Sequence, residues 1–253
     1  MVQHVDLTNL GCLTDGASAC DAVIHTAFIH DFANIAASGR IDLAAIEAIG
    51  EVLVGTTKPF VVTSGLAHAA PGQIRTEDSP PERSARASHR APSDEATLAL
   101  AARGVHTVLV RLPPSVHGDG DHGFVPALIA IARESGVSAY VGDGLNRWPA
   151  VHRLDAAQLF RLAVERGAVG ATYHGVDDDG VPTRDIAAVI GGRLKLPVVS
   201  KSTDEAVAHF GWLGAFFGAD VPSSSALTRE RLDWRPTHAS LLADLDHERY
   251  FTS

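Results

Sequence analysis

Short apolar runs alternate along this chain with longer stretches whose apolar residues recur at helical spacing. Residues 22–28, 59–64 and 105–111 are short and almost continuously apolar. Such runs predict strands that are buried on both faces of a sheet. Between the first two runs, residues 41–54 carry apolar side chains three and four positions apart, which predicts an amphipathic helix.

A second helix is expected over residues 93–103, where the end signals are clear. Ser93 is suited to cap its first turn, and Gly104 is suited to end it. The preceding residues, 70–92, are rich in proline, serine and arginine and have no periodicity, so they predict a long loop. Residues 1–7 are short and partly apolar and could form a strand, and residues 8–20 indicate a loop with a short helix.

The alternation continues in the second half of the chain. Its predicted helices are 124–135, 155–166, 183–194 and 202–210; its predicted strands are 139–141, 172–176 and 197–200; and the tail 227–251 is predicted to be helical in pieces. Strands alternating with helices predict an α/β fold, a Rossmann-like doubly wound parallel sheet. We expect two units, 1–136 as the sheet domain and 137–253 mainly as a small C-terminal α/β substrate lobe, with 155–166 possible as a return to the sheet.

Composition narrows the class of protein. The chain has 253 residues, 45% hydrophobic and 20% charged, which is enough to bury a sizeable core. Its net charge of −9 disfavours nonspecific binding to nucleic acid, and no apolar run is long enough to span a membrane. Cys12 and Cys20 lack metal-site spacing, and no secretory signal precedes them, so we expect a cytoplasmic protein with reduced thiols.

Four segments together resemble the extended short-chain dehydrogenase/reductase superfamily, and within it the NAD-dependent epimerase/dehydratase-like members. Residues 21–27 (DAVIHTA) are similar to the strand beneath the cofactor, and residues 61–64 (VVTS) to a strand ending in paired hydroxyls. Residues 111–118 (RLPPSVHG) resemble the segment beside the nicotinamide. The most specific match is the long run formed by 140–147 (YVGDGLNR) and 151–155 (VHRLD).

Two features of that family are missing from the sequence. No glycine-rich phosphate loop occurs near the N-terminus, and only about 20 residues precede Asp21 where the family has several elements. We therefore expect an N-terminally truncated Rossmann-like domain with a weakened NAD(P) site. The family's Tyr–Lys pair is also absent, because the place expected for it, 87–94, holds neither residue type.

The resemblance implies roles for individual residues. Ser64 would hold the substrate oxygen, and His117, in the usual place of a tyrosine, would be the first histidine to test for proton transfer. Arg147 and His152 would line the substrate side. Each residue also has a purely structural interpretation. The hydroxyl of Ser64 could cap a turn, and His117 could be an ordinary loop residue. Arg147 and His152 could pack the C-terminal lobe. The expected cofactor contacts are His25, Thr26, Ala27, Thr63, Pro113 and Val116.

No metal is expected, although the run 117–122 (HGDGDH) could bind one; aspartates between glycines are also ordinary turn residues. If active, the chain would be an NAD(P)-dependent oxidoreductase or epimerase/dehydratase-like enzyme acting on a small carbonyl/hydroxyl substrate. The alternatives are a cofactor-independent or inactive small-molecule-binding protein, or a truncated product of a longer reductase. We expect no nucleic-acid or membrane partner, and a homodimer formed through the helices 41–54 and 93–103 or through an exposed strand edge.

Overall fold

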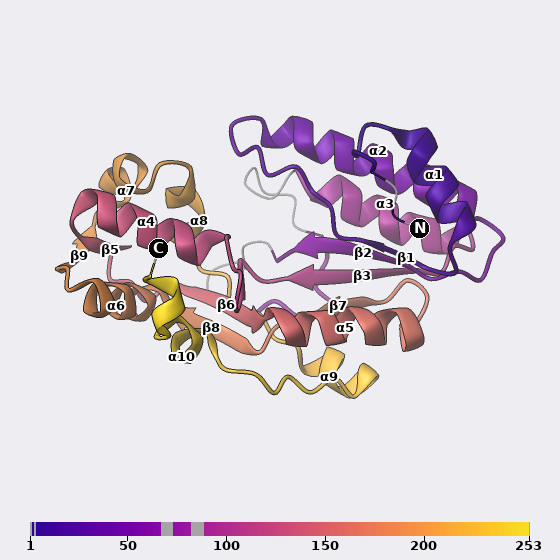
Figure 1. Cartoon of the computed structure of the whole chain (residues 1–253). Helices are drawn as coiled ribbons and strands as arrows, with labels where there is room; N and C mark the ends of the chain where they lie inside the picture. Colours follow the sequence, from indigo (N-terminus) through magenta and orange to yellow (C-terminus); the bar gives the residue numbers. More distant parts are fainter. Residues whose placement is uncertain (1, 3, 67–72, 82–88, 253) are drawn as a thin grey trace.

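A single parallel sheet forms the first half of the structure. The computed structural model describes residues 2, 4–66, 73–81 and 89–252 (Figure 1). Neighbouring strands are in the order β1-β2-β3-β7, all parallel. The three longest apolar runs are confirmed as strands, although the first is shorter than expected. The strands are β1 (Val23–His25), β2 (Phe60–Gly65), β3 (Thr107–Leu112) and β7 (Thr172–His174).

Helices cover both faces of this sheet, as the doubly wound prediction requires (Figure 1). On one face lie α1 (Leu10–Ala19), α2 (Ile35–Leu53) and α3 (Ala91–Ala102), and on the other lie α5 (Arg153–Arg166) and α9 (Ala226–Leu232). Phe60 and Val62 face the first group, whereas Val61 packs with the second. Successive side chains of β2 therefore enter different cores, which explains why the strand is apolar throughout.

The start of α3 differs from the prediction. The helix begins at Ala91, so Ser93 lies inside its first turn and does not cap it. The Ser93 hydroxyl instead donates to the carboxylate of Asp42 at 2.6 Å. The end is as expected: Gly104 follows the helix with a φ of +86°, a conformation that glycine adopts without steric cost.

The remaining elements, most of them from the second half of the chain, form a lobe around a core of its own. Three strands in this lobe were not predicted, because one has only three residues and the other two contain proline and charged residues, which single-sequence patterns assign to turns. They are β4 (Ser115–His117), β6 (Arg147–His152) and β8 (Asp178–Pro182), in the order β4-β6-β8. The other elements are α4 (Phe124–Ser135), β5 (Ser138–Val141), α6 (Thr183–Leu194), β9 (Val198–Lys201), α7 (Thr203–Phe210), η1 (Gly211–Leu213), α8 (Gly214–Phe217), α10 (Leu241–Leu245) and η2 (Glu248–Tyr250).

The outer edge of β1 has no partner strand within the described part of the chain. Residues 4–7 lie near this edge without forming a strand, and the side chain of Ile24 remains partly exposed. Beside the edge is an open hollow of about 760 Å³. None of the described helices combines the length and apolar character needed to cross a bilayer.

Candidate functional site

A buried carboxylate organises the carboxyl ends of β1 and β2. Asp42 lies in the middle of α2 and is fully buried. Its Oδ1 accepts a hydrogen bond from His25 Nε2 at 2.8 Å. Its Oδ2 accepts from Arg90 Nη1 at 3.0 Å and from Ser93 Oγ at 2.6 Å. Three donors, one from β1 and two from the start of α3, therefore meet on one carboxylate.

These donors keep Asp42 ionised. Burial alone would raise the pKa of its carboxyl, but the hydrogen bonds from His25 and Ser93 and the charge of Arg90 outweigh burial, so the pKa lies below its ordinary value. Arg90 also donates to the backbone oxygen of Thr63 at 3.1 Å and lies 4.2 Å above the ring of Phe28. The Arg90 guanidinium therefore contacts residues near the ends of both β1 and β2.

Ser64 lies at the end of β2 but is almost fully buried, at 3% exposed. Its Oγ has no partner of hydrogen-bond geometry, although the hydroxyl is close enough to Asp94 to lower the pKa of that carboxyl. Burial has the larger effect and raises the pKa of Asp94, while the charge of Arg111, whose Nε is 3.2 Å from Asp94 Oδ2, opposes it. The Oγ1 of Thr63 is likewise buried without a partner. Unpaired buried hydroxyls are uncommon in folded proteins, and two of them lie at this strand end.

The hollow beside β1 is lined by several of the predicted cofactor contacts. His25, Thr26 and Ala27 form one wall, and residues 5–8 form another. The lining contains no lysine or arginine, and its one carboxylate is that of Asp6. Asp6 Oδ1 accepts a hydrogen bond from the backbone nitrogen of Thr8 at 2.7 Å.

His117 lies in a different cluster, inside the lobe. It is 1% exposed, and its Nδ1 is 3.0 Å from Oδ2 of Asp244, which also accepts from the hydroxyl of Tyr250 at 2.8 Å. Its Nε2 is buried without a hydrogen-bond partner. Burial lowers the pKa of His117, against the opposing charges of nearby aspartates. No contact between His117 and Ser64 is found among the described residues, so the two predicted catalytic residues occupy separate clusters.

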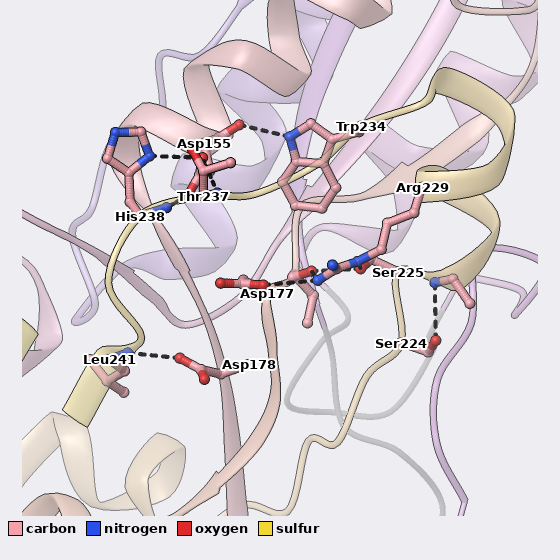
Figure 2. Close-up of polar contacts among 12 residues, drawn as sticks. Asp155, Asp177, Asp178, Ser224, Ser225, Arg229, Trp234, Thr237, His238 and Leu241 are labelled. Carbon is pink, nitrogen blue, oxygen red and sulfur yellow. Dashed lines mark hydrogen bonds and ion pairs between the residues drawn. The ribbon is translucent and has the colours of Figure 1, made fainter. Parts of the chain in front are cut away.

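The imidazole of His152 contacts His117 edge to face and stacks on His238 with ring centroids 4.6 Å apart and planes 7° apart. Asp155 holds His238 Nδ1 at 2.8 Å and accepts from the backbone nitrogens of Thr237 and His238 (Figure 2). His152, Asp155 and His238 are close enough to suggest a metal site. The in-plane lone pairs of two parallel rings do not converge on one ion, however. His152 Nδ1 also accepts from the nitrogen of Leu154 at the start of α5. The cluster therefore serves to fasten the C-terminal segment to α5.

The remaining predicted residues lie apart from these clusters. Arg147 forms a hydrogen-bonded ion pair with Asp220, with Nη2 and Oδ2 2.9 Å apart and both side chains more than a third exposed. Pro113 and Val116 lie in the turn and strand that lead from β3 into the lobe. In the loop 117–122, Asp121 Oδ1 accepts from the nitrogen of Gly123, which is ordinary turn bonding.

Sequence reasoning missed Asp42, Arg90 and Asp94. A signal for Asp42 was present, because it falls on the same helical face as Ile46, Ile49 and Leu53, where a carboxylate must find partners. Arg90 and Asp94 lie in the segment 87–94, which lacks the tyrosine and lysine of the family. Their partners are distant in sequence, and only the fold brings them together.

Comparison with known proteins identifies the relatives of the chain. The model of the "NAD dependent epimerase/dehydratase family" matches residues 1–175. An uncharacterized protein of Schizosaccharomyces pombe is 48% identical over 97% of this chain and 83% of its own length. A second, from Saccharomyces cerevisiae, is 44% identical over 95% of this chain and 80% of its own length.

Solved structures share the fold. A dTDP-glucose 4,6-dehydratase from Streptomyces venezuelae, with NAD and TYD bound, superposes with a TM-score of 0.79 at 20% identity, covering 98% of this chain and 78% of that one. The RMD protein of Pseudomonas aeruginosa, complexed with NADPH, gives a TM-score of 0.72 at 18% identity, covering 96% and 85%. At these identities the likeness establishes the Rossmann-like architecture.

Proposed function

Because the chain belongs to the NAD-dependent epimerase/dehydratase family, we propose that it is an NAD(P)-dependent oxidoreductase acting on a small organic substrate with a carbonyl or hydroxyl group. The observation that carries this proposal is the polar cluster at the carboxyl ends of β1 and β2. It combines an ionised Asp42, the guanidinium of Arg90 and the unpaired hydroxyls of Thr63 and Ser64. Ligands of open parallel sheets bind at this edge.

The residues present fit only part of a dinucleotide. The nicotinamide side would lie at the strand ends, next to the open hollow of about 760 Å³. The proposed contacts are His25, Thr26 and Ala27 at the end of β1, Thr63 on β2, and Pro113 and Val116 after β3. A pyrophosphate needs cations or free backbone N–H groups. The hollow lacks lysine and arginine, contains Asp6, and adjoins a helix α1 already capped by the side chain of Asn9. We therefore propose that NAD(P) binds weakly.

Each proposed group has a specific task. When bound, the cofactor would supply hydride exchange. Ser64 would hold the substrate oxygen through its unpaired Oγ, which is the kind of group that costs free energy unless a ligand satisfies it. His117, whose Nε2 is unpaired, is the proposed group for a second proton transfer, to a part of the substrate that faces the lobe. Arg147 and His152 are the proposed substrate contacts.

The test is turnover of a panel of small aldehydes, ketones and secondary alcohols, followed by the absorbance of NADH or NADPH. We expect slow but measurable turnover that needs millimolar cofactor. His117→Gln, assayed beside the wild type with its unfolding midpoint measured, tests the lobe-side role. Undiminished turnover in this variant would remove His117 from the proposal.

A second candidate function is supported by the lining of the hollow. The hollow is lined by Asp6 and by no lysine or arginine. Such a lining also suits a protein that binds a small molecule without a nucleotide cofactor. This alternative predicts no saturable binding of either nucleotide and no turnover with any member of the panel.

A further inference from the structure

His25 differs from the other histidines near the sheet in having its tautomer set by a buried charge. Asp42 is ionised and its Oδ1 lies 2.8 Å from His25 Nε2, so this nitrogen must carry the proton of the hydrogen bond. In the neutral ring the lone pair is then on Nδ1. No described residue bonds Nδ1.

The two oxygens of Asp42 divide their partners in a way that isolates this pair. Arg90 and Ser93 both bind Oδ2, and Oδ1 is left to His25 alone. The positive charge of Arg90 offsets the desolvation cost of the buried Asp42 carboxylate. A charged imidazole is therefore not needed to stabilise that carboxylate. His25 is therefore held in place through Nε2, and its Nδ1 has no hydrogen-bond partner among the described residues.

The position of His25 suits a ligand. It is the last residue of β1, pairs in register with Val62 of β2, and lines the open hollow. Ser64 lies two residues further along β2, and Arg90 bridges the two strand ends through Thr63. One histidine and one unpaired hydroxyl thus lie on neighbouring strands at the same edge of the sheet.

We propose that His25 Nδ1 is the acid/base group for the substrate oxygen, with Asp42 as its positioning residue; this inference rests on the proposed function. In the direction of alcohol oxidation, the bond from Nδ1 to hydrogen forms as the O–H bond of the alcohol breaks. The ring becomes an imidazolium beside Asp42 and returns the proton to solvent. In the reverse direction it gives the proton to the carbonyl oxygen. No electrons are exchanged in this proton step.

The other histidines are less suited to this task. His117 is enclosed in the lobe, with Nδ1 fixed on Asp244. His30 and His89 lie near Arg90 and have no carboxylate bonded to their rings within the described residues. Burial and the charge of Arg90 lower the pKa of both.

The first experiment measures the tautomer directly. Long-range nitrogen–proton NMR spectra of histidine-labelled protein, with the His25 signals identified by their loss in His25→Gln, should show hydrogen on Nε2 and a lone pair on Nδ1 at neutral pH. In Asp42→Asn the Nε2–H form should lose its dominance. A ring with hydrogen on Nδ1 in the wild type, or an unchanged tautomer in Asp42→Asn, would overturn the proposal.

The second experiment measures turnover with the carbonyl panel. His25→Gln keeps a donor for Asp42 but cannot accept a proton at Nδ1, and should lose turnover by about 10²-fold or more. His106→Gln is the matched control, because His106 bonds the backbone oxygen of Gly167 near the amino end of β3. It should keep wild-type turnover.

The outcomes of the two experiments separate the two proposals. Equal turnover of His25→Gln and wild type would reject His25 as the acid/base group and leave the proposed function standing. A wild type without turnover on any substrate, at saturating cofactor, would contradict the proposed function. That result would also reject the catalytic role of His25. The NMR spectra would then show only whether Asp42 sets the tautomer of the His25 ring.

Discussion

Individual buried polar side chains hold together the segments at the carboxyl end of the sheet. Asp42 could not remain ionised inside α2 without donors, and the fold supplies them from β1 and from the start of α3. Removing one partner of such a group leaves the other buried and unpaired, which costs more than the bond itself contributes. Residues far apart in sequence thereby become dependent on one another.

The buried hydroxyl of Ser64 can be removed without breaking a hydrogen bond of good geometry. Ser64→Ala removes an Oγ that has no partner of hydrogen-bond geometry and only lies near the Asp94 carboxyl, so the folded state should lose little stability. Turnover should fall by about 10²-fold or more if the hydroxyl holds the substrate oxygen. Steady-state kinetics and thermal unfolding check both parts, with Ser135→Ala on the surface of α4 as the control. Full turnover in Ser64→Ala would contradict the assignment.

His174 predicts how stability depends on pH. The side chain is fully buried, and its Nδ1 is 2.9 Å from the backbone oxygen of Ser224. Burial lowers its pKa from 6.5 to about 3. Below pH 6.5 the unfolded chain takes up a proton that the folded chain refuses, so this contribution to stability is complete above 6.5 and is lost as the pH falls toward 3.

The expected loss over that window is on the order of 4 kcal/mol. His174→Asn retains a donor for Ser224 but does not titrate, so its unfolding free energy should fall less steeply between pH 6.5 and 3 than that of the wild type. Urea unfolding at a series of pH values measures both slopes, with His4→Asn as an exposed control. Parallel slopes for His174→Asn and wild type would show that His174 is not buried as a neutral ring.

At the scale of elements, the sequence predicts buried strands and long helices well and predicts short lobe strands poorly. The apolar runs became β2 and β3 nearly in full because burial on both faces demands continuous apolar residues. β8 consists of Asp178–Pro182, whose composition is that of a turn. Its strand conformation comes from antiparallel pairing with β6, which no local pattern encodes.

The candidate site was predictable to a similar extent. The ends of β1 and β2 were identified from the runs around His25 and Ser64, and the structure places both at the carboxyl edge of one sheet. The separation of His117 from Ser64 could not be predicted, because it depends on β4 pairing with β6 of the lobe and not with the main sheet. The structure buries Phe210 and Phe217 in the lobe and stacks Trp212 on Phe32 at 4.0 Å.

The contact between α2 and α3 gives a prediction about packing. A Cβ added to Gly50 would lie 2.3 Å from Cδ1 of Leu100, which is itself buried. Gly50→Ala should therefore destabilise the protein by about 1–3 kcal/mol, despite the better helix propensity of alanine. Gly192→Ala in α6 is the matched control, since nothing lies near its added Cβ, and it should stabilise by about 0.5–1 kcal/mol. Chemical denaturation decides the question; a stabilised Gly50→Ala would contradict the close helix contact.

At the scale of the whole molecule, we predict that assembly depends on the outer faces of α2 and α3 and on the outer edge of β1, which has no partner strand among the described residues. Ile46, Leu53 and Leu100 pack inside the chain, so part of the apolar surface expected at a dimer interface covers the sheet instead. Leu43 and Leu98 remain partly exposed, and Ile24 is 45% exposed at the strand edge.

We predict a homodimer with a tendency to aggregate, because an unpaired edge with apolar neighbours favours pairing with another chain. Light scattering after size exclusion measures the mass at several concentrations. Ile24→Lys, which places a charge on the edge, should reduce aggregation, whereas Val169→Lys, at an exposed position away from β1, should not. A monomer that stays monodisperse for days at tens of micromolar would refute both the dimer and the exposed edge.

We propose that the described part of this chain offers a site for the nicotinamide side of NAD(P) without a cradle for its pyrophosphate. Fluorescence titration of the protein with NADH and NADPH tests it most directly. We expect saturable binding with a dissociation constant weaker than about 10 μM, more than 1.4 kcal/mol short of micromolar affinity. A dissociation constant of about 1 μM or tighter for this chain, or no saturable binding of either nucleotide, would contradict it.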